Sequence, residues 1–497
     1  MAMRTTGATR TTTATRPVDT DYLVVGAGAM GMAFTDALID HADVHVTLVD
    51  RRHGPGGHWQ DAYPFVQLHQ ASAFYGVAST VLGTGAVQRD GPEAGLHERA
   101  RRSEVQAYYD DLLHRRFVGS GRVTFLGGCE HRGPDPEGRR GRRDGHGGRR
   151  VELVTSLVSG ETLRVRVRRR VVDATYLSPT IPATTPPPFG VATGARVVPV
   201  NELARLTDAP SSFVLVGSGK TATDAVVWLL INGVPPDRIV WVRPREPWML
   251  NRAVVQPDPV VALGLAADTM AAAADAVSLD VLFLRLEAAG VMLRIDPGAV
   301  PTMAKTPTLA AWELELLRTV ERVVRLGHVT QVTGGELVCE GGTVPLARGA
   351  LVVHCAASGL RYPPVVPIWG PDRIRIQIVR AGFPCFGAAL AGYVEATRSD
   401  GREAGGDADR ERNRVCPPNR LPDTRADWAR MQVQGARATQ AFGAEPDIAA
   451  WADACALNPA RVEPARRADP VVRAAAARLA DVSERGLARL AALADAP

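Results

Sequence analysis

The sequence predicts an α/β fold made of two similar strand–turn–helix units, a helical insert and a helical C-terminal tail. The glycine-rich stretches "VVGAGAMG" (24–31) and "LVGSGKTA" (215–222) each follow an apolar run typical of a buried strand and precede a helical pattern. An Ala- and Arg-rich region with helical periodicity follows a polar break after Ala396. The length of 497 residues accommodates two to three domains of roughly 100–200 residues each.

The composition is that of an ordinary globular protein, with 45% hydrophobic and 22% charged residues. The net charge of +5 is small for the length and comes almost entirely from arginine, because Lys220 and Lys305 are the two lysines. The basic run 137–150 is rich in glycine and lacks aromatic residues. We interpret it as a flexible surface loop and expect no nucleic-acid partner.

Neither a membrane segment nor a metal site is expected. Residues 1–20 lack the apolar core of a signal peptide and are expected to form a disordered tail, and the apolar run 260–277 is interrupted by Asp268 and Asp275. The six cysteines include no close pair, which argues against a redox disulfide and a zinc site. We therefore expect a cytoplasmic protein with reduced thiols, no metal and no membrane partner.

The first unit has the G-x-G-x-x-G pattern of a Rossmann-like dinucleotide-binding domain, in which the helix N-terminus faces a pyrophosphate. The next apolar strand ends in Asp50, 24 residues after the first glycine, where an acid accepts hydrogen bonds from ribose hydroxyls. The unit is therefore predicted to bind an unphosphorylated ribose, as in FAD. Its candidate cofactor-binding residues are Gly26, Ala27, Gly28, Ala29, Met30, Gly31, Asp50 and Arg51.

The second unit contains "GSGKT", which is also the end of a triphosphate-binding loop. That loop needs a glycine five residues before Gly219, and Val214 stands there, so an ATPase is not favoured. The next strand ends in Arg243 and Arg245, and an arginine at this place can bind a 2′-phosphate. NADPH is therefore predicted here, with candidate cofactor-binding residues Gly217, Ser218, Gly219, Lys220, Thr221, Arg243 and Arg245. Lys220 is interpreted as a phosphate contact or a solvated helix-start residue.

Four further stretches occur in the order found in class B flavin-containing monooxygenases. These are "RRHGPGGHWQDAYP" (51–64), "RRVVDATYLSPTIP" (169–182), "ALVVHCAASGL" (350–360) and "GFPCFGAALAGYVEA" (382–396). The sequence resembles that family of flavoproteins with two dinucleotide-binding domains. The resemblance implies FAD and NADPH as cofactors, His58 and Trp59 beside the flavin, and a helix from about Gly382 directed at the flavin.

The chain departs from the family at functional positions and is identified as a divergent member. The family pattern F-x-G-x-x-x-H is absent, because Phe189 and Gly190 are not followed by a histidine. Where the Baeyer–Villiger branch has Arg-x-Asp, this chain has Gln67-Leu68-His69, and Tyr75 stands near the place of an active-site Asn in the heteroatom-oxidising branch.

The resemblance implies an oxidoreductase, an FAD- and NADPH-dependent monooxygenase that inserts one oxygen atom from O2 into a small-molecule substrate through a C4a-(hydro)peroxyflavin. Two alternatives remain open at this point. One is an NADPH-dependent reductase or dehydrogenase without oxygen insertion, and the other is a flavin-binding sensor or catalytically dead scaffold. The substrate and the oligomeric state are not readable from the sequence, which allows a homo-oligomer.

His69 and Arg252 are the candidate catalytic residues. A histidine near a flavin can hold or deliver a proton, with turn capping or a ribose contact as the alternative. Arg252 lies in "WMLNR" (248–252), which resembles the loop that returns toward the active site, and a surface salt bridge is its alternative. The region 258–326 is predicted to be a helical insert, with an irregular segment at 301–310 and a helix over 308–326.

The predicted organisation has five parts. Residues 1–20 form the tail, 21–205 the first part of the FAD domain, 206–338 the NADPH domain with the insert, 339–400 the second part of the FAD domain, and 401–497 the helical extension. Trp428 and Trp451 are the expected anchors of that extension.

Overall fold

A computed structural model describes residues 18–136, 150–357, 359–398 and 407–495. Residues 137–149 of the basic run and residues 1–17 of the predicted tail lie outside these residues. Residues 18–20 belong to the first strand rather than to a tail, since β1 begins at Val18. The strand forms here because its apolar residues Tyr22, Leu23 and Val24 are fully buried.

The first Rossmann-like sheet has seven strands in the order β3-β2-β1-β6-β5-β4, with β19 also pairing with β6. The pairs β3–β2, β2–β1, β1–β6 and β6–β19 are parallel, and β4, β5 and β6 run antiparallel. The strands are β1 (Val18–Val25), β2 (Val46–Asp50), β3 (Val123–Gly127), β4 (Cys129–Pro134), β5 (Arg150–Ser156), β6 (Thr162–Asp173) and β19 (Arg373–Arg375).

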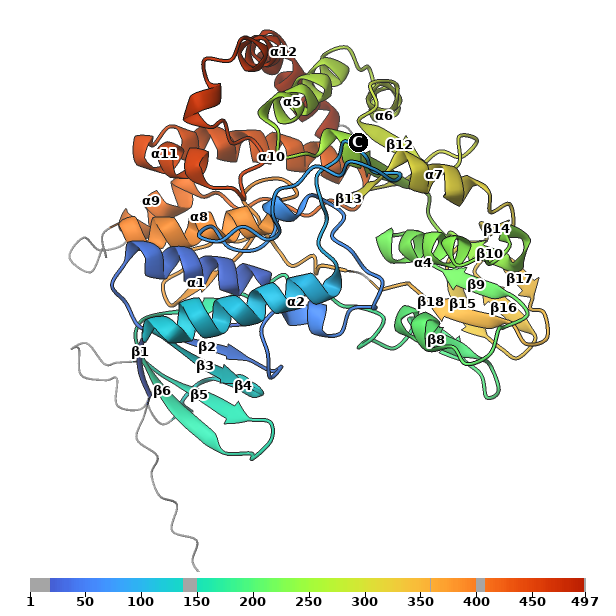
Figure 1. The fold of residues 1–497 in the computed structure, drawn as a ribbon, viewed down its shortest axis with the longest axis horizontal. Helices are drawn as coiled ribbons and strands as arrows, with labels where there is room; N and C mark the ends of the chain where they lie inside the picture. Colours follow the sequence, from blue (N-terminus) through green and yellow to red (C-terminus); the bar gives the residue numbers. More distant parts are fainter. Residues whose placement is uncertain (1–17, 137–149, 358, 399–406, 496–497) are drawn as a thin grey trace, which may run out of the picture.

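Helices α1 (Ala29–His41), α2 (Arg102–Asp111) and α8 (Pro384–Thr397) lie on one side of this sheet (Figure 1). α1 and α8 pack closely, because a Cβ at Gly392 would lie 2.5 Å from the carbonyl oxygen of Phe34. The predicted helix near Gly382 is thus confirmed as α8, and its packing brings residues 384–397 back to the first domain.

The second Rossmann-like sheet is fully parallel, in the order β14-β10-β9-β18-β8. It consists of β8 (Val197–Pro199), β9 (Phe213–Val216), β10 (Ile239–Val242), β14 (Val323–Val324) and β18 (Leu351–His354), with helix α4 (Lys220–Ile231) after the glycine turn. The prediction of two Rossmann-like domains is confirmed. The strand pairing differs from the predicted boundaries, which had put β8 and β18 with the first domain, because hydrogen bonding between distant strands sets the sheet.

The insert contains β11 (Pro247–Asn251), β12 (Met292–Arg294), β13 (Met303–Leu309), α5 (Pro259–Ala274), α6 (Leu279–Ala288) and α7 (Ala311–Arg318). The predicted irregular segment 301–310 is wrong, since β13 pairs in parallel with β11. The helix predicted over 308–326 is also too long. It ends at Arg318, and Val323 and Val324 join the second sheet beside β10. Here sheet pairing overrides the local helical periodicity.

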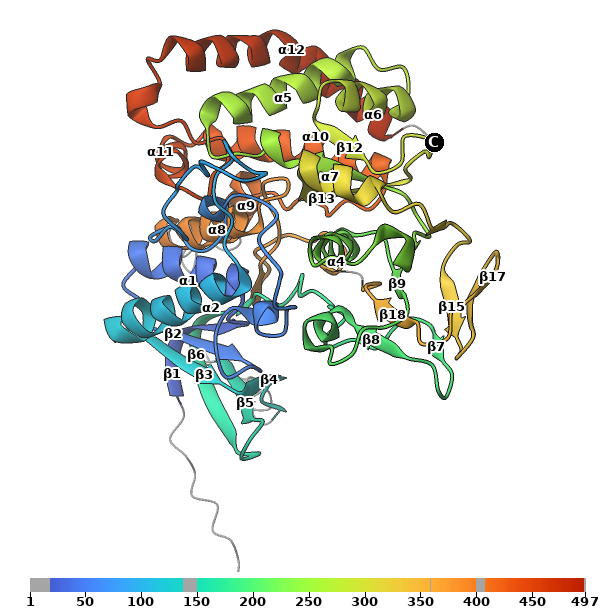
Figure 2. The ribbon, with the colours of Figure 1, turned by 45° about the vertical axis from the view of Figure 1, so that its right-hand side comes forward.

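A separate four-stranded sheet lies at the edge of the second domain (Figure 2). It consists of β7 (Gly190–Val191), β15 (Val329–Val332), β16 (Glu336–Cys339) and β17 (Gly342–Pro345).

The C-terminal extension forms helices α9 (Asp407–Val415), α10 (Arg425–Gly443), α11 (Pro446–Ala454) and α12 (Pro470–Ala494). α10 and α12 lie beside the insert helix α5 (Figures 1 and 2). Trp428 is 2% exposed and its ring is 5.4 Å from that of Phe283, while Trp451 stacks on Tyr393 at 4.9 Å. Both tryptophans therefore anchor the extension to the rest of the chain.

Candidate functional site

The first glycine turn has the geometry that a dinucleotide needs. Gly26 has φ = +105°, a conformation that favours glycine, and a Cβ on Gly31 would overlap the carbonyl oxygen of Gly26. α1 begins at Ala29 without a side-chain cap, which leaves its first N–H groups for an anion. Met30 lies in this first turn of the helix.

Asp50, at the end of β2, is 8% exposed and holds the turn directly. Its Oδ2 accepts a hydrogen bond from the Ala27 N–H and its Oδ1 from the Arg52 N–H, both at 2.8 Å. A carboxylate oxygen has a second acceptor site, so these bonds still leave acceptor capacity on both oxygens. Arg51 points elsewhere, with its Nε 3.7 Å from Glu130 and a side chain that is 72% exposed.

A second glycine loop packs against this turn. Gly56 and Gly57 both have positive φ, and a Cβ on Gly57 would lie 3.0 Å from the Cα of Gly28. Burial, with a smaller contribution from Arg52, lowers the pKa of His58 to about 4, so its ring is neutral at physiological pH. Trp59 is buried and donates a hydrogen bond from Nε1 to the Tyr75 hydroxyl at 2.6 Å.

The second glycine turn is open at its tip. Gly217 has φ = +132°, and a Cβ there would lie 3.2 Å from the carbonyl oxygen of Cys355. A Cβ on Gly219 would meet no atom within 4 Å, and α4 begins directly after it without a side-chain cap. Ser218 and Thr221 flank this point in the chain.

Lys220 is neither solvated nor unpaired, so its interpretation as a solvated residue is wrong. Its side chain is 12% exposed, and Nζ lies 2.5 Å from Asp224 Oδ1 and 3.5 Å from Glu313 Oε1. Asp224 also accepts a hydrogen bond from the Tyr63 hydroxyl at 2.7 Å. α7, which carries Glu313, is adjacent to α4, and this tertiary contact draws the lysine inward.

Arg243 lies one residue beyond β10 and is only 3% exposed. Its guanidinium lies 4.8 Å from the centre of the Trp241 ring, and its Nε is 3.4 Å from Glu246. Nε and Nη1 nevertheless have no hydrogen-bond acceptor among the described residues. Burial is the main reason that its pKa is lowered. Arg245 instead pairs with Asp423 of the C-terminal extension at 2.8 Å.

Arg252 is 1% exposed and every nitrogen of its guanidinium has a partner. Nη2 lies 2.7 Å from Glu313, Nη1 binds Glu93, and Nε donates to the carbonyl oxygen of His69 at 3.2 Å and to Thr308 Oγ1 at 3.3 Å. The ion pairs are buried, contrary to the surface salt bridge considered from the sequence. Each of the three guanidinium nitrogens of Arg252 is thus engaged within the protein.

His69 and Arg252, both predicted from the sequence, are therefore brought together, but through the main chain of His69. Thr308 Oγ1 also donates to the His69 carbonyl. Burial is the largest influence on the imidazole and, with the charges of Lys220 and Arg252, lowers its pKa to about 3. The ring is thus neutral, and its buried Nδ1 has no partner among the described residues.

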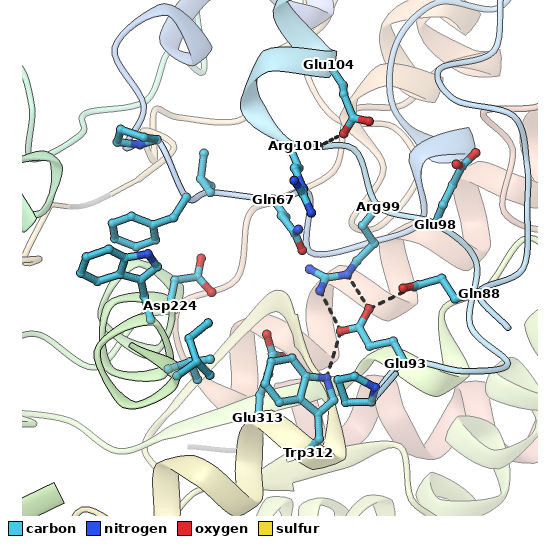
Figure 3. A pocket seen from close by; sticks show the side chains of 17 residues that line it. Gln67, Gln88, Glu93, Glu98, Arg99, Arg101, Glu104, Asp224, Trp312 and Glu313 are labelled. Carbon is cyan, nitrogen blue, oxygen red and sulfur yellow. Dashed lines mark hydrogen bonds and ion pairs between the residues drawn. The ribbon is translucent and has the colours of Figure 1, made fainter. Parts of the chain in front are cut away.

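A cavity of about 640 Å³ lies beside this network, between the segment 64–67, the loop 88–101, α4 and α7 (Figure 3). Figure 3 shows Glu93 and Arg99 facing each other there, 2.7 Å apart, with Trp312 donating to Glu93 from below at 3.1 Å. Burial alone would raise the pKa of Glu313, but Lys220 and Arg252 lower it to about 2. Glu313 is therefore ionised.

The sequence did not reveal Glu93, Arg99, Asp224 and Glu313 as parts of one cluster. Glu313 did carry a local signal, since it is the third residue of α7 and accepts from the Ala310 N–H at 2.8 Å, as a helix-capping acid does. Its partner Arg252 is 61 residues away, and no motif connects the two.

The described part of the chain holds no group of three or more His, Cys, Asp or Glu side chains arranged to bind a metal. Within the same residues, no helix has the length and apolar character to cross a membrane. All six cysteines are buried and unpaired.

Residues 24–76 match a family model described as an NAD(P)-binding Rossmann-like domain. Solved structures with similarity include a cyclohexanone-bound cyclohexanone monooxygenase (TM-score 0.48, 14% identity, covering 80% of this chain and 91% of that one). Another is the polycyclic ketone monooxygenase of Thermothelomyces thermophila (TM-score 0.49, 14% identity, 95% and 89% covered).

Two curated relatives are far more similar in sequence. The uncharacterized protein Rv2000 of Mycobacterium tuberculosis and the uncharacterized protein Mb2023 of Mycobacterium bovis are each 38% identical to this chain over 446 residues. In both cases the match covers 89% of this chain and 78% of the relative. The chain belongs to the same protein family as these two mycobacterial proteins.

Proposed function

We propose that the protein is an FAD- and NADPH-dependent flavoprotein monooxygenase that oxidises a small molecule with O2. The observation that carries the proposal is the contrast between the two glycine turns. The first has Asp50 at the end of the neighbouring strand, and the second has the buried Arg243, two of whose nitrogens lack an acceptor within the described part of the chain. One site is thus suited to an unphosphorylated ribose and the other to a ribose phosphate.

The residues of the first turn fit FAD. The Gly26 and Gly31 backbones approach too closely for a side chain, and the uncapped start of α1 offers N–H groups to a pyrophosphate. Asp50 keeps acceptor capacity for ribose hydroxyls. Trp59 and Tyr75 are buried and joined by a hydrogen bond, so a flavin beside them would be shielded from water on that side.

The residues of the second turn fit NADPH. Gly219 leaves open space at the start of α4, where a pyrophosphate would accept backbone hydrogen bonds. Arg243 has a desolvated guanidinium with free donors, and such a group gains much from a 2′-phosphate acceptor. Arg245 is already paired with Asp423 and supplies less.

Bound FAD would accept hydride from NADPH and activate O2, which is chemistry of the cofactor itself. The protein's part is to position groups and control protons. His69 is neutral, and its buried Nδ1, which has no partner among the described residues, is free to donate or accept a hydrogen bond as its tautomer allows. Arg252 keeps the His69 main chain in place, so we assign it a positioning role rather than a catalytic one.

A reductase without oxygen insertion is the second candidate. It is favoured by one observation: all guanidinium nitrogens of Arg252 are engaged with Glu93, Glu313, Thr308 and His69, and two carboxylates balance its charge, so this arginine is poorly suited to stabilise an oxygen anion.

Rapid mixing of the FAD-loaded protein with NADPH in air separates the two candidates. A monooxygenase should show bleaching of the flavin absorbance, then a transient band distinct from reduced and oxidised flavin, then reoxidation. Direct reoxidation without the transient band, with and without candidate substrates, would support the reductase. A purified protein that takes up no FAD would contradict both.

A further inference from the structure

We propose that Glu313 is a positioning residue that couples ligand binding at the second glycine turn to the placement of His69. This inference rests on the proposed function, because it assigns the second turn to NADPH and gives His69 a part in the flavin chemistry. It concerns a series of buried contacts that runs from Lys220 through Glu313 and Arg252 to the His69 carbonyl.

Glu313 divides its carboxylate between two cations. It is 4% exposed, and its Oε2 accepts from Arg252 Nη2 at 2.7 Å and from the Ala310 N–H at 2.8 Å. Its Oε1 faces Lys220 Nζ at the longer distance of 3.5 Å. The contact between Glu313 and Lys220 is therefore the weakest contact of this series.

Lys220 is the residue at which a bound pyrophosphate would act. It is the first residue of α4 and follows Gly219 directly, where the helix N–H groups are uncapped. A phosphate placed there attracts the ammonium group, which is also held by Asp224 at 2.5 Å. The contact of Lys220 with Glu313 is longer than its contact with Asp224 and therefore breaks first.

His69 lies at the other end of this series of contacts. When Lys220 moves away from Glu313, Arg252 and the Ala310 N–H remain the partners of that buried carboxylate, and the repulsion between Lys220 and Arg252, which opposes a closer approach of Arg252, decreases. Arg252 then shifts toward Glu313. Its Nε holds the His69 carbonyl at 3.2 Å, so the shift alters the placement of the imidazole.

The electrostatic surroundings support this coupling. Lys220 and Arg252 are the two charges that most strongly disfavour protonation of the His69 ring after burial itself. The same two cations balance Glu313. A change at Lys220 is therefore sensed at His69 both through the Glu313–Arg252 contacts and through the electric field.

The test uses the FAD-loaded protein and 2′-phospho-ADP-ribose, which carries the pyrophosphate and 2′-phosphate of NADPH but has no nicotinamide ring to touch the flavin. Binding is measured by calorimetry, and the ligand-induced change in the visible flavin spectrum is recorded in parallel. The wild-type protein should show a clear spectral change. Glu313→Gln should still bind the ligand, while its spectral change falls about fivefold or more, a typical size for site–site coupling.

The matched control is Glu315→Gln, the same substitution two residues along α7, at an exposed side chain. It should retain the wild-type spectral change. Lys220→Met tests the Lys220 end of this series of contacts and keeps the Glu313–Arg252 pair. It therefore tests the coupling even if Glu313→Gln does not fold. It should also lose the spectral change, as should His69→Gln.

A full wild-type spectral change in Glu313→Gln, Lys220→Met or His69→Gln would overturn the coupling while leaving the proposed cofactors intact. A wild-type protein that binds FAD and 2′-phospho-ADP-ribose without any spectral change would also overturn it. Failure of the wild-type protein to bind FAD at all would instead contradict the proposed function.

Discussion

Nη2 of Arg252 lies 2.7 Å from Oε2 of Glu313, and the two side chains are 1% and 4% exposed. The pair joins the segment after β11 to α7, and Glu93 on the other side of Arg252 extends it to the loop that borders the cavity. A buried charge is tolerated only when it is paired. This cluster therefore both stabilises the contact between these segments and restricts how Arg252 can act.

Arg252→Met should lower the free energy of unfolding by about 3–5 kcal/mol, because it leaves two buried carboxylates without their shared cation. Urea unfolding of the purified protein measures this. The control is Arg115→Met. Arg115 is 83% exposed and pairs with Asp111 at the surface, so this substitution should lower the free energy of unfolding by about 0–1 kcal/mol. Equal costs for the two substitutions would show that the buried cluster contributes nothing special.

Arg243→Gln should weaken binding of adenosine 2′,5′-bisphosphate by roughly 10- to 100-fold, the value of a lost charge-assisted hydrogen bond. Its effect on adenosine 5′-monophosphate should be small, because that ligand lacks the 2′-phosphate. Calorimetric titration of both ligands gives the ratio. Arg245→Gln should have a smaller effect, since Arg245 is already paired with Asp423; the reverse order would overturn the assignment of Arg243.

Acid should destabilise the protein in part through His69. Its pKa is lowered from 6.5 to about 3 in the folded state, so the unfolded state binds the proton more readily. The contribution of neutral His69 to the free energy of unfolding is fully present above the unfolded pKa of 6.5. It decreases as the pH falls below 6.5 and is lost completely only below about pH 3.

Between pH 7.5 and about 5 the loss from this one histidine should be about 2 kcal/mol. Unfolding free energies of the wild type and His69→Gln at both pH values isolate it, because His58 and other groups titrate equally in both proteins. A variant with the same acid sensitivity as the wild type would show that His69 is not buried in its neutral form.

Gly31→Ala should abolish FAD retention and lower stability by about 1–3 kcal/mol, because its Cβ would overlap the Gly26 carbonyl and force the turn apart. Gly264→Ala, within α5, is the matched control, since a Cβ there meets no atom within 4 Å. The flavin absorbance per protein chain checks the first expectation. Normal flavin content in Gly31→Ala would mean that the first turn does not hold the cofactor.

Much of the fold followed from local patterns. The two glycine turns, the strands before them and the helices after them were predicted because each depends on residues close together in the sequence. The spacing from Gly26 to Asp50 and from Gly217 to Arg243 also identified the strand ends that flank each turn. His69 and Arg252 became candidates through the resemblance to the flavin-containing monooxygenases.

Other features depend on partners far apart in the sequence. Val323 and Val324 have the spacing of a helix but lie in a strand, because β10 offers a free edge for parallel pairing. β18 joins the second sheet by parallel pairing with β9, and β8 joins it by parallel pairing with β18.

The amino-acid sequence by itself determined the two dinucleotide turns, since glycine conformation, helix starts and strand ends are local properties. Only the tertiary structure decided the state of the charges. Arg252 meets Glu93 across 159 residues and Glu313 across 61. Burial makes such pairs strong and unpaired charges costly, so which side chains remain free to act is settled only when the chain is packed.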